Sequence, residues 1–367
     1  MTSALEELTR NGVSIWLDDM SRERLTGGDL QDLVDHRQVS GVTANPSIFA
    51  SALKNGRAYD DQIGDLAAWR VSTDAMIRHV MAYDIRGACD VLRPVYERTG
   101  HVDGRASIEV DPRIAHDAER TTAEAKGLAF LIDRPNLFVK IPATAEGLFS
   151  ITDATAAGIS VNVTLIFGLD RYDQVMDAYL TGLEEAQQAG RDLSPIHPLA
   201  PFFASGVDAD IAKRVDESGA ERAAGLRGRA AIANARLAYE RYTRMTASPR
   251  WQALRDAGAN PQRPLWASTG VKNPAYEDTM YVTQLVAPDT VNTMPEATLD
   301  AVADHGDIRG NTISGTYDSA RHVLAELEQV GISYADVVQL LEDQGIEKFT
   351  KAYAQLEDSV RTASGRL

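Results

Sequence analysis

The sequence predicts a (β/α)8 barrel, a closed parallel sheet of eight strands with helices between the strands. Eight short runs are rich in β-branched or aromatic residues, and each is bounded by Gly, Pro, Asn or Asp, as strands usually are. Between these runs, apolar residues recur at three- and four-residue spacing, which is the period of an amphipathic helix. Strands that alternate with helices are typical of parallel α/β folds, and eight such units suit a barrel.

The strand candidates follow one another along the chain. The first four are 13–19 (VSIWLDD), 41–45 (GVTAN), 105–110 (RASIEV) and 136–142 (NLFVKIP). The last four are 158–164 (GISVNVT), 198–204 (PLAPFFA), 263–268 (RPLWAS) and 289–294 (DTVNTM). We expect one barrel domain over 1–367, in which 315–367 are mainly appended helices. A doubly wound open sheet is the alternative, but it usually carries a G-x-G-x-x-G phosphate loop, which this sequence lacks.

Composition narrows the class of protein. The 367 residues include 37 basic and 53 acidic ones, a net charge of −16, so we expect no binding to nucleic acid or to anionic membranes. A single cysteine allows no intrachain disulfide. No apolar run approaches the roughly 20 residues of a membrane span, and the N-terminal segment does not resemble a signal peptide. We therefore expect a cytoplasmic monomer or homodimer.

Polar residues occur inside strands that a barrel should bury on both faces. A buried polar group is costly unless it has a partner. These residues gather toward the carboxyl ends of the strands, where barrel active sites form. The set therefore predicts a polar centre at that end of the barrel. Its members are Asp18, Thr43, Asn45, Glu109, Lys140, Asn162, Thr164 and Ser268.

Lys140 is the most informative member of this set. Alternation along the strand places it on the same face as Phe138. An ordinary lysine amine has a pKa of about 10.4, but burial favours the neutral amine, which can attack a carbonyl to form a Schiff base. Asp18 and Glu109 could carry the protons for such chemistry, although the adjacent Asp19 makes the choice of aspartate ambiguous. The alternatives are a lysine at a strand end that extends to solvent, and carboxylates with a purely structural role.

No metal or cofactor site is expected. The seven histidines are scattered, without an H-x-x-x-H pair and without a cysteine partner. The G-x-S-x-G turn that carries a serine nucleophile in many hydrolases does not occur either.

Several segments resemble the transaldolase family, in particular its long actinobacterial type. They include 41–49 (GVTANPSIF), 107–113 (SIEVDPR), 136–148 (NLFVKIPATAEGL), 158–167 (GISVNVTLIF) and 262–274 (QRPLWASTGVKNP). The resemblance extends over essentially the whole chain. It implies a barrel enzyme of the pentose phosphate pathway that transfers a dihydroxyacetone unit from a ketose phosphate to an aldose phosphate, without cofactor or metal.

The resemblance also implies roles for individual residues. Lys140 matches the Schiff-base lysine, and Asp18 matches the acid/base of carbon–carbon cleavage. Glu109 and Thr164 match a pair that orders a catalytic water. The residues that would position the three-carbon unit are Thr43, Asn45 and Asn162.

The sixth strand departs from the family pattern. That pattern reads Ser-x-Phe-x-x-Arg, and its Ser and Arg bind the sugar phosphate. Aligned on Phe203, this chain has Pro201 in place of the Ser and Gly206 in place of the Arg. Phe203, Ser268 and Lys272 remain as predicted substrate-binding residues, and Ser268 and Lys272 could still contact a phosphate. Two alternatives therefore stay open: a relative that acts on a different, unphosphorylated carbonyl substrate, and a non-catalytic barrel.

Overall fold

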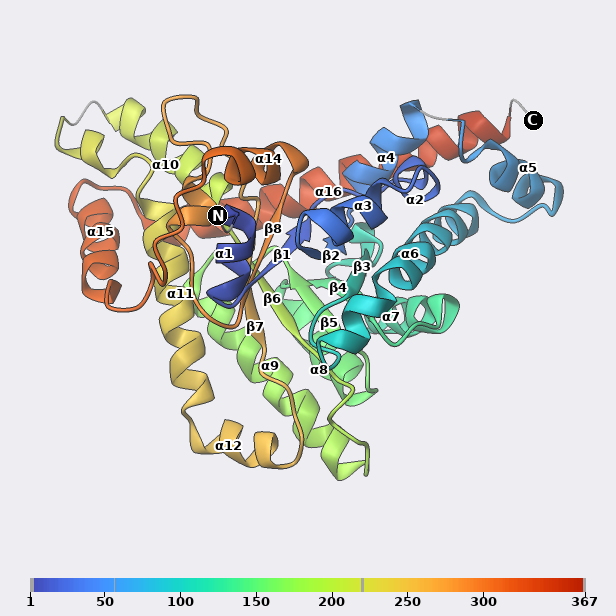
Figure 1. The fold of residues 1–367 in the computed structure, drawn as a ribbon, viewed down its shortest axis with the longest axis horizontal. Coiled ribbons are helices and arrows are strands. Elements are labelled where there is room, and N and C mark those ends of the chain that lie inside the picture. The colour runs from blue at the N-terminus through green and yellow to red at the C-terminus, as the bar shows by residue number, and fades with distance from the viewer. Residues whose placement is uncertain (1–2, 56, 219–220, 366–367) are drawn as a thin grey trace.

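The computed structural model describes residues 3–55, 57–218 and 221–365. Its centre is a closed barrel in which eight parallel strands follow one another in sequence order and the last pairs with the first. This confirms the predicted fold class (Figure 1). The strands are β1 (Val13–Leu17), β2 (Val39–Thr43), β3 (Arg105–Glu109), β4 (Leu137–Pro142), β5 (Val161–Thr164), β6 (Leu199–Phe203), β7 (Arg263–Ala267) and β8 (Thr290–Met294).

Helices surround the barrel and connect its strands. Those before β5 are α1 (Ala4–Arg10), α2 (Arg22–Thr26), α3 (Asp29–His36), α4 (Pro46–Asn55), α5 (Asp60–Ala68), α6 (Thr73–Arg98), the 3-10 helix η1 (Pro112–Ile114), α7 (Ala118–Ile132) and α8 (Ala145–Ala156). After β5 come α9 (Leu169–Gln188), α10 (Ser205–Ser218), η2 (Glu221–Leu226), α11 (Ala230–Thr246), α12 (Pro249–Asp256), α13 (Met280–Thr283) and α14 (Glu296–His305). The C-terminal helices α15 (Tyr317–Gln329) and α16 (Tyr334–Ser364) confirm the expectation of appended helices. None of the helices in the described ranges is both long and apolar enough to cross a membrane.

All eight predicted strands are present, but their ends differ. β1, β2 and β7 stop one or two residues before the predicted ends, so Asp18, Asn45 and Ser268 lie just beyond their strands. β5 begins at Val161 because Gly158, which has a φ of +87°, turns the chain before the strand starts. A side chain just beyond a strand still faces the mouth of the barrel, because the mouth is where the strands end.

The interior of the barrel has its own apolar layer, separate from the larger core between strands and helices. Phe138 and Trp16 belong to this layer, together with Leu199, Leu265, Ala267 and Val291. Lys140 lies two residues after Phe138 on the same strand and therefore on the same inner face. The apolar layer separates the polar mouth from the opposite end of the barrel.

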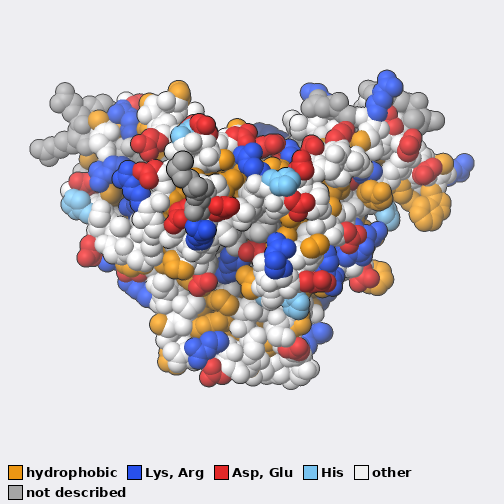
Figure 2. Space-filling view, in the orientation of Figure 1, with side chains coloured by type: hydrophobic (Ala, Val, Ile, Leu, Met, Phe, Trp, Pro, Cys, Tyr) orange, Lys and Arg blue, Asp and Glu red, His pale blue; other side chains and the backbone are white. Residues whose placement is uncertain are grey.

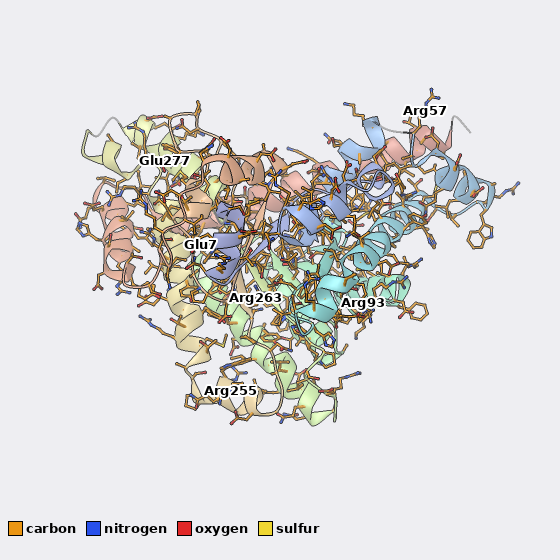
Figure 3. The ribbon with its side chains drawn as sticks, viewed as in Figure 1. Glu7, Arg57, Arg93, Arg255, Arg263 and Glu277 are labelled. Atoms are coloured by element: carbon orange, nitrogen blue, oxygen red, sulfur yellow. The ribbon has the colours of Figure 1, made fainter. Side chains whose placement is uncertain are left out.

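A buried polar network closes that opposite end, and no local pattern in the sequence predicts it. Asp103 accepts hydrogen bonds from Ser14 Oγ at 2.5 Å and from Trp16 Nε1 at 3.2 Å. Arg263 donates to Ser14 Oγ at 2.5 Å and lies 3.4 Å from Asp103 (Figure 3). Arg105, fully buried, donates to the carbonyl of His101. Charged residues inside this barrel are therefore not confined to its mouth.

Gly41 is required by the packing of this interior. A Cβ on Gly41 would overlap the indole of Trp16, which is fully buried and has no space into which to move. We expect Gly41→Ala to lower the free energy of unfolding by about 1–3 kcal/mol, measured by urea denaturation. Gly127→Ala in α7 is the matched control, because no atom lies within 4 Å of its Cβ position. That variant should be neutral or more stable by up to about 1 kcal/mol; equal stability of the two variants would contradict the packing argument.

Candidate active site

Three predicted residues lie at one level on adjacent strands. Glu109 of β3 is in register with Lys140 of β4, which is in register with Asn162 of β5. The Lys140 amine is 3.2 Å from Glu109 Oε2 and donates a hydrogen bond to the Ala44 carbonyl at 3.2 Å. Both side chains of the ion pair are nearly completely buried. The structure thus brings a buried amine and a buried carboxyl into direct contact.

The environment of Glu109 favours its protonated form. Burial raises the pKa of its carboxyl, and the positive charge of Lys140 opposes this effect without cancelling it. The contact with Lys140 satisfies the distance of an ion pair, but no hydrogen bond with good geometry reaches either Glu109 oxygen from the described residues. A carboxyl with a raised pKa can exchange a proton nearer to neutral pH than an ordinary glutamate.

Asp18 approaches the same amine from the other side of the mouth. Its backbone N–H donates to the carbonyl of Met294 at 2.9 Å, which holds the residue beside β8. Asp18 Oδ1 accepts a hydrogen bond from Thr43 Oγ1 at 2.8 Å, and the Thr43 hydroxyl lies 2.8 Å from that of Thr293. Burial raises the pKa of Asp18, opposed first by the charge of Lys140 and then by the Thr43 hydrogen bond. Asp18 is therefore also suited to exchange protons.

Asp19, the next residue, has a different environment. It forms an ion pair with Arg24 at 2.8 Å and lies on the outer side of the cavity described below. Arg24 also pairs with Glu296 at 2.8 Å. The ambiguity between the two adjacent aspartates is thus decided by their partners: Asp18 lies near the amine, and Asp19 belongs to a surface ion-pair network.

Buried polar atoms that lack a hydrogen-bond partner gather around Lys140. Among the described residues, Thr164 Oγ1, Asn162 Oδ1 and the Glu109 carboxyl oxygens have no hydrogen bond to protein. The Asn162 side-chain amide donates to Ser107 Oγ at 2.8 Å, which holds the side chain in place. Its Oδ1 atom remains free to accept a hydrogen bond from a ligand. Buried polar groups normally have partners, and a substrate hydroxyl or a water can supply them here.

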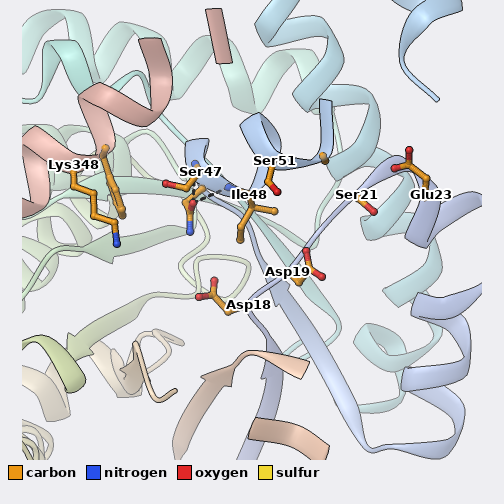
Figure 4. Close-up of a pocket in the computed structure, with 11 residues that line it drawn as sticks. Asp18, Asp19, Ser21, Glu23, Ser47, Ile48, Ser51 and Lys348 are labelled. Carbon is orange, nitrogen blue, oxygen red and sulfur yellow. Dashed lines mark hydrogen bonds between the residues drawn. The ribbon is translucent and has the colours of Figure 1, made fainter. Parts of the chain in front are cut away.

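A cavity of about 610 Å³ is lined by two of the predicted site residues, Asp18 and Asn45. Lys348 and Phe349 line it from the C-terminal helix α16, and Figure 4 shows Lys348 and Asp18 in this cavity. Asn45 Oδ1 accepts hydrogen bonds from the N–H groups of Ser47 and Ile48, which caps α4 and leaves the Asn45 Nδ2 group to donate to a ligand. In the described ranges, no group of three or more His, Cys, Asp or Glu residues could hold a metal ion.

Comparison with known proteins shows the family of the chain. The family model for transaldolase/fructose-6-phosphate aldolase matches residues 15–360. The chain is 61% identical over 360 residues to a transaldolase of Thermobifida fusca, covering 98% of each chain. It is also 58% identical to transaldolase 2 of Streptomyces avermitilis and 54% identical to a transaldolase of Frankia alni, in both cases over 100% of this chain and 99% of the relative.

The chain belongs to the transaldolase/fructose-6-phosphate aldolase family. The match includes both the polar centre around Lys140 and the C-terminal helix α16 that lines the cavity.

The sixth and seventh strands of this transaldolase homologue end at the remaining predicted binding residues. Phe203, at the end of β6, packs against Phe167 with ring centroids 5.1 Å apart. Ser268 follows β7 with a φ of +55°, and its hydroxyl lies 2.8 Å from that of Ser205. These residues form a second group, on the β6–β7 side of the mouth. Gly206 is the second residue of α10, and a Cβ there would meet only Leu341 and Phe167, at 3.7 and 3.8 Å.

Three further residues at the mouth were not singled out from the sequence. Thr293 and Ser107 are polar residues inside predicted strands, so the same criterion that selected Thr43 could have found them. Lys348 carries no such signal, because a lysine in an amphipathic helix is usually a solvated surface residue. Only the path of α16 places it at the cavity of this transaldolase homologue.

Proposed function

We infer that this chain is a transferase of the transaldolase type, which moves a dihydroxyacetone unit between sugar phosphates through a Schiff base on Lys140. The observation that carries this inference is the buried Lys140 amine in contact with Glu109 and facing Asp18. An isolated buried charge is costly, and a buried amine between two carboxyls with raised pKa values is suited to reversible proton transfer. The family and the names of the relatives support the same activity.

The first half of the reaction forms the imine. The neutral amine of Lys140 attacks the ketose carbonyl carbon, and a proton passes to the carbonyl oxygen to give a carbinolamine. The Glu109 carboxylate takes a proton from the attacking nitrogen and, with Thr164 holding a water, returns it to the hydroxyl, which leaves as water. The product is a protonated imine. Thr43, Asn45 and Asn162 hold the hydroxyl groups of the three carbons next to it.

The second half breaks and remakes a carbon–carbon bond. The Asp18 carboxylate removes the proton from the C4 hydroxyl of the ketose, and the C3–C4 bond breaks as its electron pair moves into the imine. An aldose phosphate leaves, and the enamine on Lys140 then attacks the aldehyde carbon of the acceptor. Asp18 returns its proton to the new alkoxide, and water releases the product from Lys140 with the help of Glu109.

Borohydride reduction tests this function. With fructose 6-phosphate present, reduction should convert the imine to a stable secondary amine on Lys140, detected by mass spectrometry of the digested protein. A coupled assay with an aldose phosphate acceptor should show transfer. An adduct on another residue, or none with any ketose donor, would overturn the proposal. The alternative of a non-catalytic barrel is favoured only by the changed sixth strand, and the contact of the buried Lys140 amine with Glu109 argues against it.

Glu109 should control the pH dependence of imine formation. Its carboxylate form is needed as a base, and burial raises its pKa, so the rate should fall with decreasing pH at values above the range of an ordinary glutamate. Glu109→Gln should slow borohydride-trapped imine formation by about 100-fold or more and remove this acid limb. The measurement is a single-turnover trapping rate against pH. If the trapping rate of Glu109→Gln still falls at low pH as in the unmodified protein, the titrating group is not Glu109.

A further inference from the structure

The C-terminal helix α16 forms part of the wall of the active-site cavity. The helix crosses the mouth end of the barrel (Figure 1), and in its first third Glu342 pairs with Arg171 of α9 at 3.4 Å. Near its C-terminal end, Glu357 pairs with Arg113 at 3.3 Å, and the Arg113 guanidinium lies 4.5 Å from the ring centroid of Tyr353. Closer to the cavity, Phe349 is buried and lines the wall. A side chain next to Phe349 on this helix is therefore presented to the cavity by a fixed element.

Lys348 is that side chain. It lines the cavity, and its amine extends toward the space above Asp18, with Asp19 and Glu23 on the far side (Figure 4). Within the described residues it forms no ion pair, whereas Lys351, one turn further along, is paired with Glu347 at 2.5 Å. The cavity thus has an acidic side and a cationic side. An anionic group on a ligand should lie on the side of Lys348.

Lys272 contributes a second positive charge on the same side. It lies on the loop that follows β7, four residues after Ser268, and it also has no ion pair with the described residues. Partial burial and then the positive charge of Lys348 lower the pKa of Lys272. Two ammonium groups that repel each other are stabilised when an anion binds to both.

The position that lacks the family arginine faces the same helix. A Cβ on Gly206 would be in ordinary contact with Leu341 of α16. Leu341 and Lys348 are seven residues apart, which is about two helical turns, so they lie on the same face of α16. The helix face in front of Gly206 is therefore the face that carries Lys348. The Lys348 amine can thus supply positive charge to the region that an arginine side chain at position 206 would reach.

We propose that Lys348 of α16, together with Lys272, binds the phosphate group of the sugar substrate in place of the arginine that this chain lacks at position 206. This proposal rests on the function inferred above. It makes Lys348 a specificity residue that contacts the end of the substrate remote from the reacting carbonyl. It also accounts for sugar-phosphate recognition by a chain with Pro201 and Gly206 in its sixth strand.

Lys348→Gln, Lys272→Gln and the double variant test the proposal, with Lys351→Gln as the matched control on the same helix. Each single substitution should raise the KM for fructose 6-phosphate by about 10-fold or more, because each removes a charge-assisted hydrogen bond to the phosphate. The kcat should stay within about threefold, because Lys348 does not touch the reacting atoms. Inhibition by inorganic phosphate should weaken by the same factor as KM. The kcat/KM for unphosphorylated fructose should not change, and Lys351→Gln should behave as the unmodified protein.

An equal loss of kcat with both donors, with inhibition by inorganic phosphate unchanged, would overturn the proposal and show that Lys348 acts through the charge of Asp18. Thermal melting of each variant excludes a folding defect, which is not expected for an exposed side chain. Calorimetric binding of inorganic phosphate separates this proposal from the function on which it rests. If no imine is trapped with any donor but Lys348→Gln still weakens phosphate binding, the Schiff-base function fails and the phosphate site stands. If an imine is trapped but Lys348→Gln leaves phosphate binding unchanged, the phosphate site fails and the Schiff-base function stands.

Discussion

Replacement of Lys140 by methionine should lower the kcat for transfer by at least about 10⁴-fold, because the reaction loses its covalent nucleophile. Borohydride trapping should then give no adduct. Methionine is chosen because it keeps most of the volume of the lysine side chain. The variant should still fold, since burial already raises the pKa of Glu109 and its carboxyl can take up a proton once the amine is gone.

Two controls make this result specific. Thermal unfolding should show a folded protein, even though removing one member of a buried ion pair is usually destabilising. Lys272→Met should retain trapping on Lys140, because Lys272 lies outside the polar centre. Transfer activity in Lys140→Met within about 100-fold of the unmodified protein, or a trapped adduct at another lysine, would show that the nucleophile has been misassigned.

Asp18→Asn should separate imine formation from carbon–carbon cleavage. Asparagine can still accept the hydrogen bond from Thr43, but it cannot remove the proton of the C4 hydroxyl. Transfer should fall by about 10²–10⁴-fold, which is the usual contribution of a general acid/base. Imine formation should continue, so that borohydride traps the whole ketose phosphate on Lys140 rather than the three-carbon fragment. The two adducts differ in mass and are distinguished by mass spectrometry.

Asp19→Asn is the matched control for Asp18. The two residues are adjacent in sequence, but Asp19 pairs with Arg24 near the surface and does not face the amine. Arg24 keeps its ion pair with Glu296 when Asp19 is replaced, so we expect activity within about threefold of the unmodified protein. An effect of Asp19→Asn as large as that of Asp18→Asn would contradict the assignment of the acid/base.

The raised pKa values at this site also bear on stability. Asp18 and Glu109 both bind a proton more tightly in the folded protein than in the unfolded chain. Each therefore contributes stability below its ordinary pKa, and this contribution is lost as the pH rises through the higher folded pKa. The polar centre thus lowers stability when both carboxyls are ionised, as is common for sites whose groups are arranged for chemistry rather than packing.

Much of the fold followed from local sequence patterns. Strand and helix periods predicted all eight strands and the appended helices, because each strand of a barrel pairs with its sequence neighbours and needs no long-range information to be placed. The polar residues at the strand ends were also found from the sequence, because a buried strand tolerates them only for a reason.

Other features depended on distant parts of the chain. The pairing of Asp103 with Arg263 across the closed end of the barrel joins residues far apart in sequence, and nothing in either segment indicates the other. The choice between Asp18 and Asp19 was decided by Thr43 and Arg24, which approach from different sides.

The sequence by itself thus determined the fold class and the presence of Lys140 at the centre of the site, since alternation and the cost of burial are local properties. Only the tertiary structure decided that Lys140 contacts Glu109, and that Lys348 reaches the cavity from α16. The physical reason is that a helix period reports which face a residue occupies, but not which element that face meets.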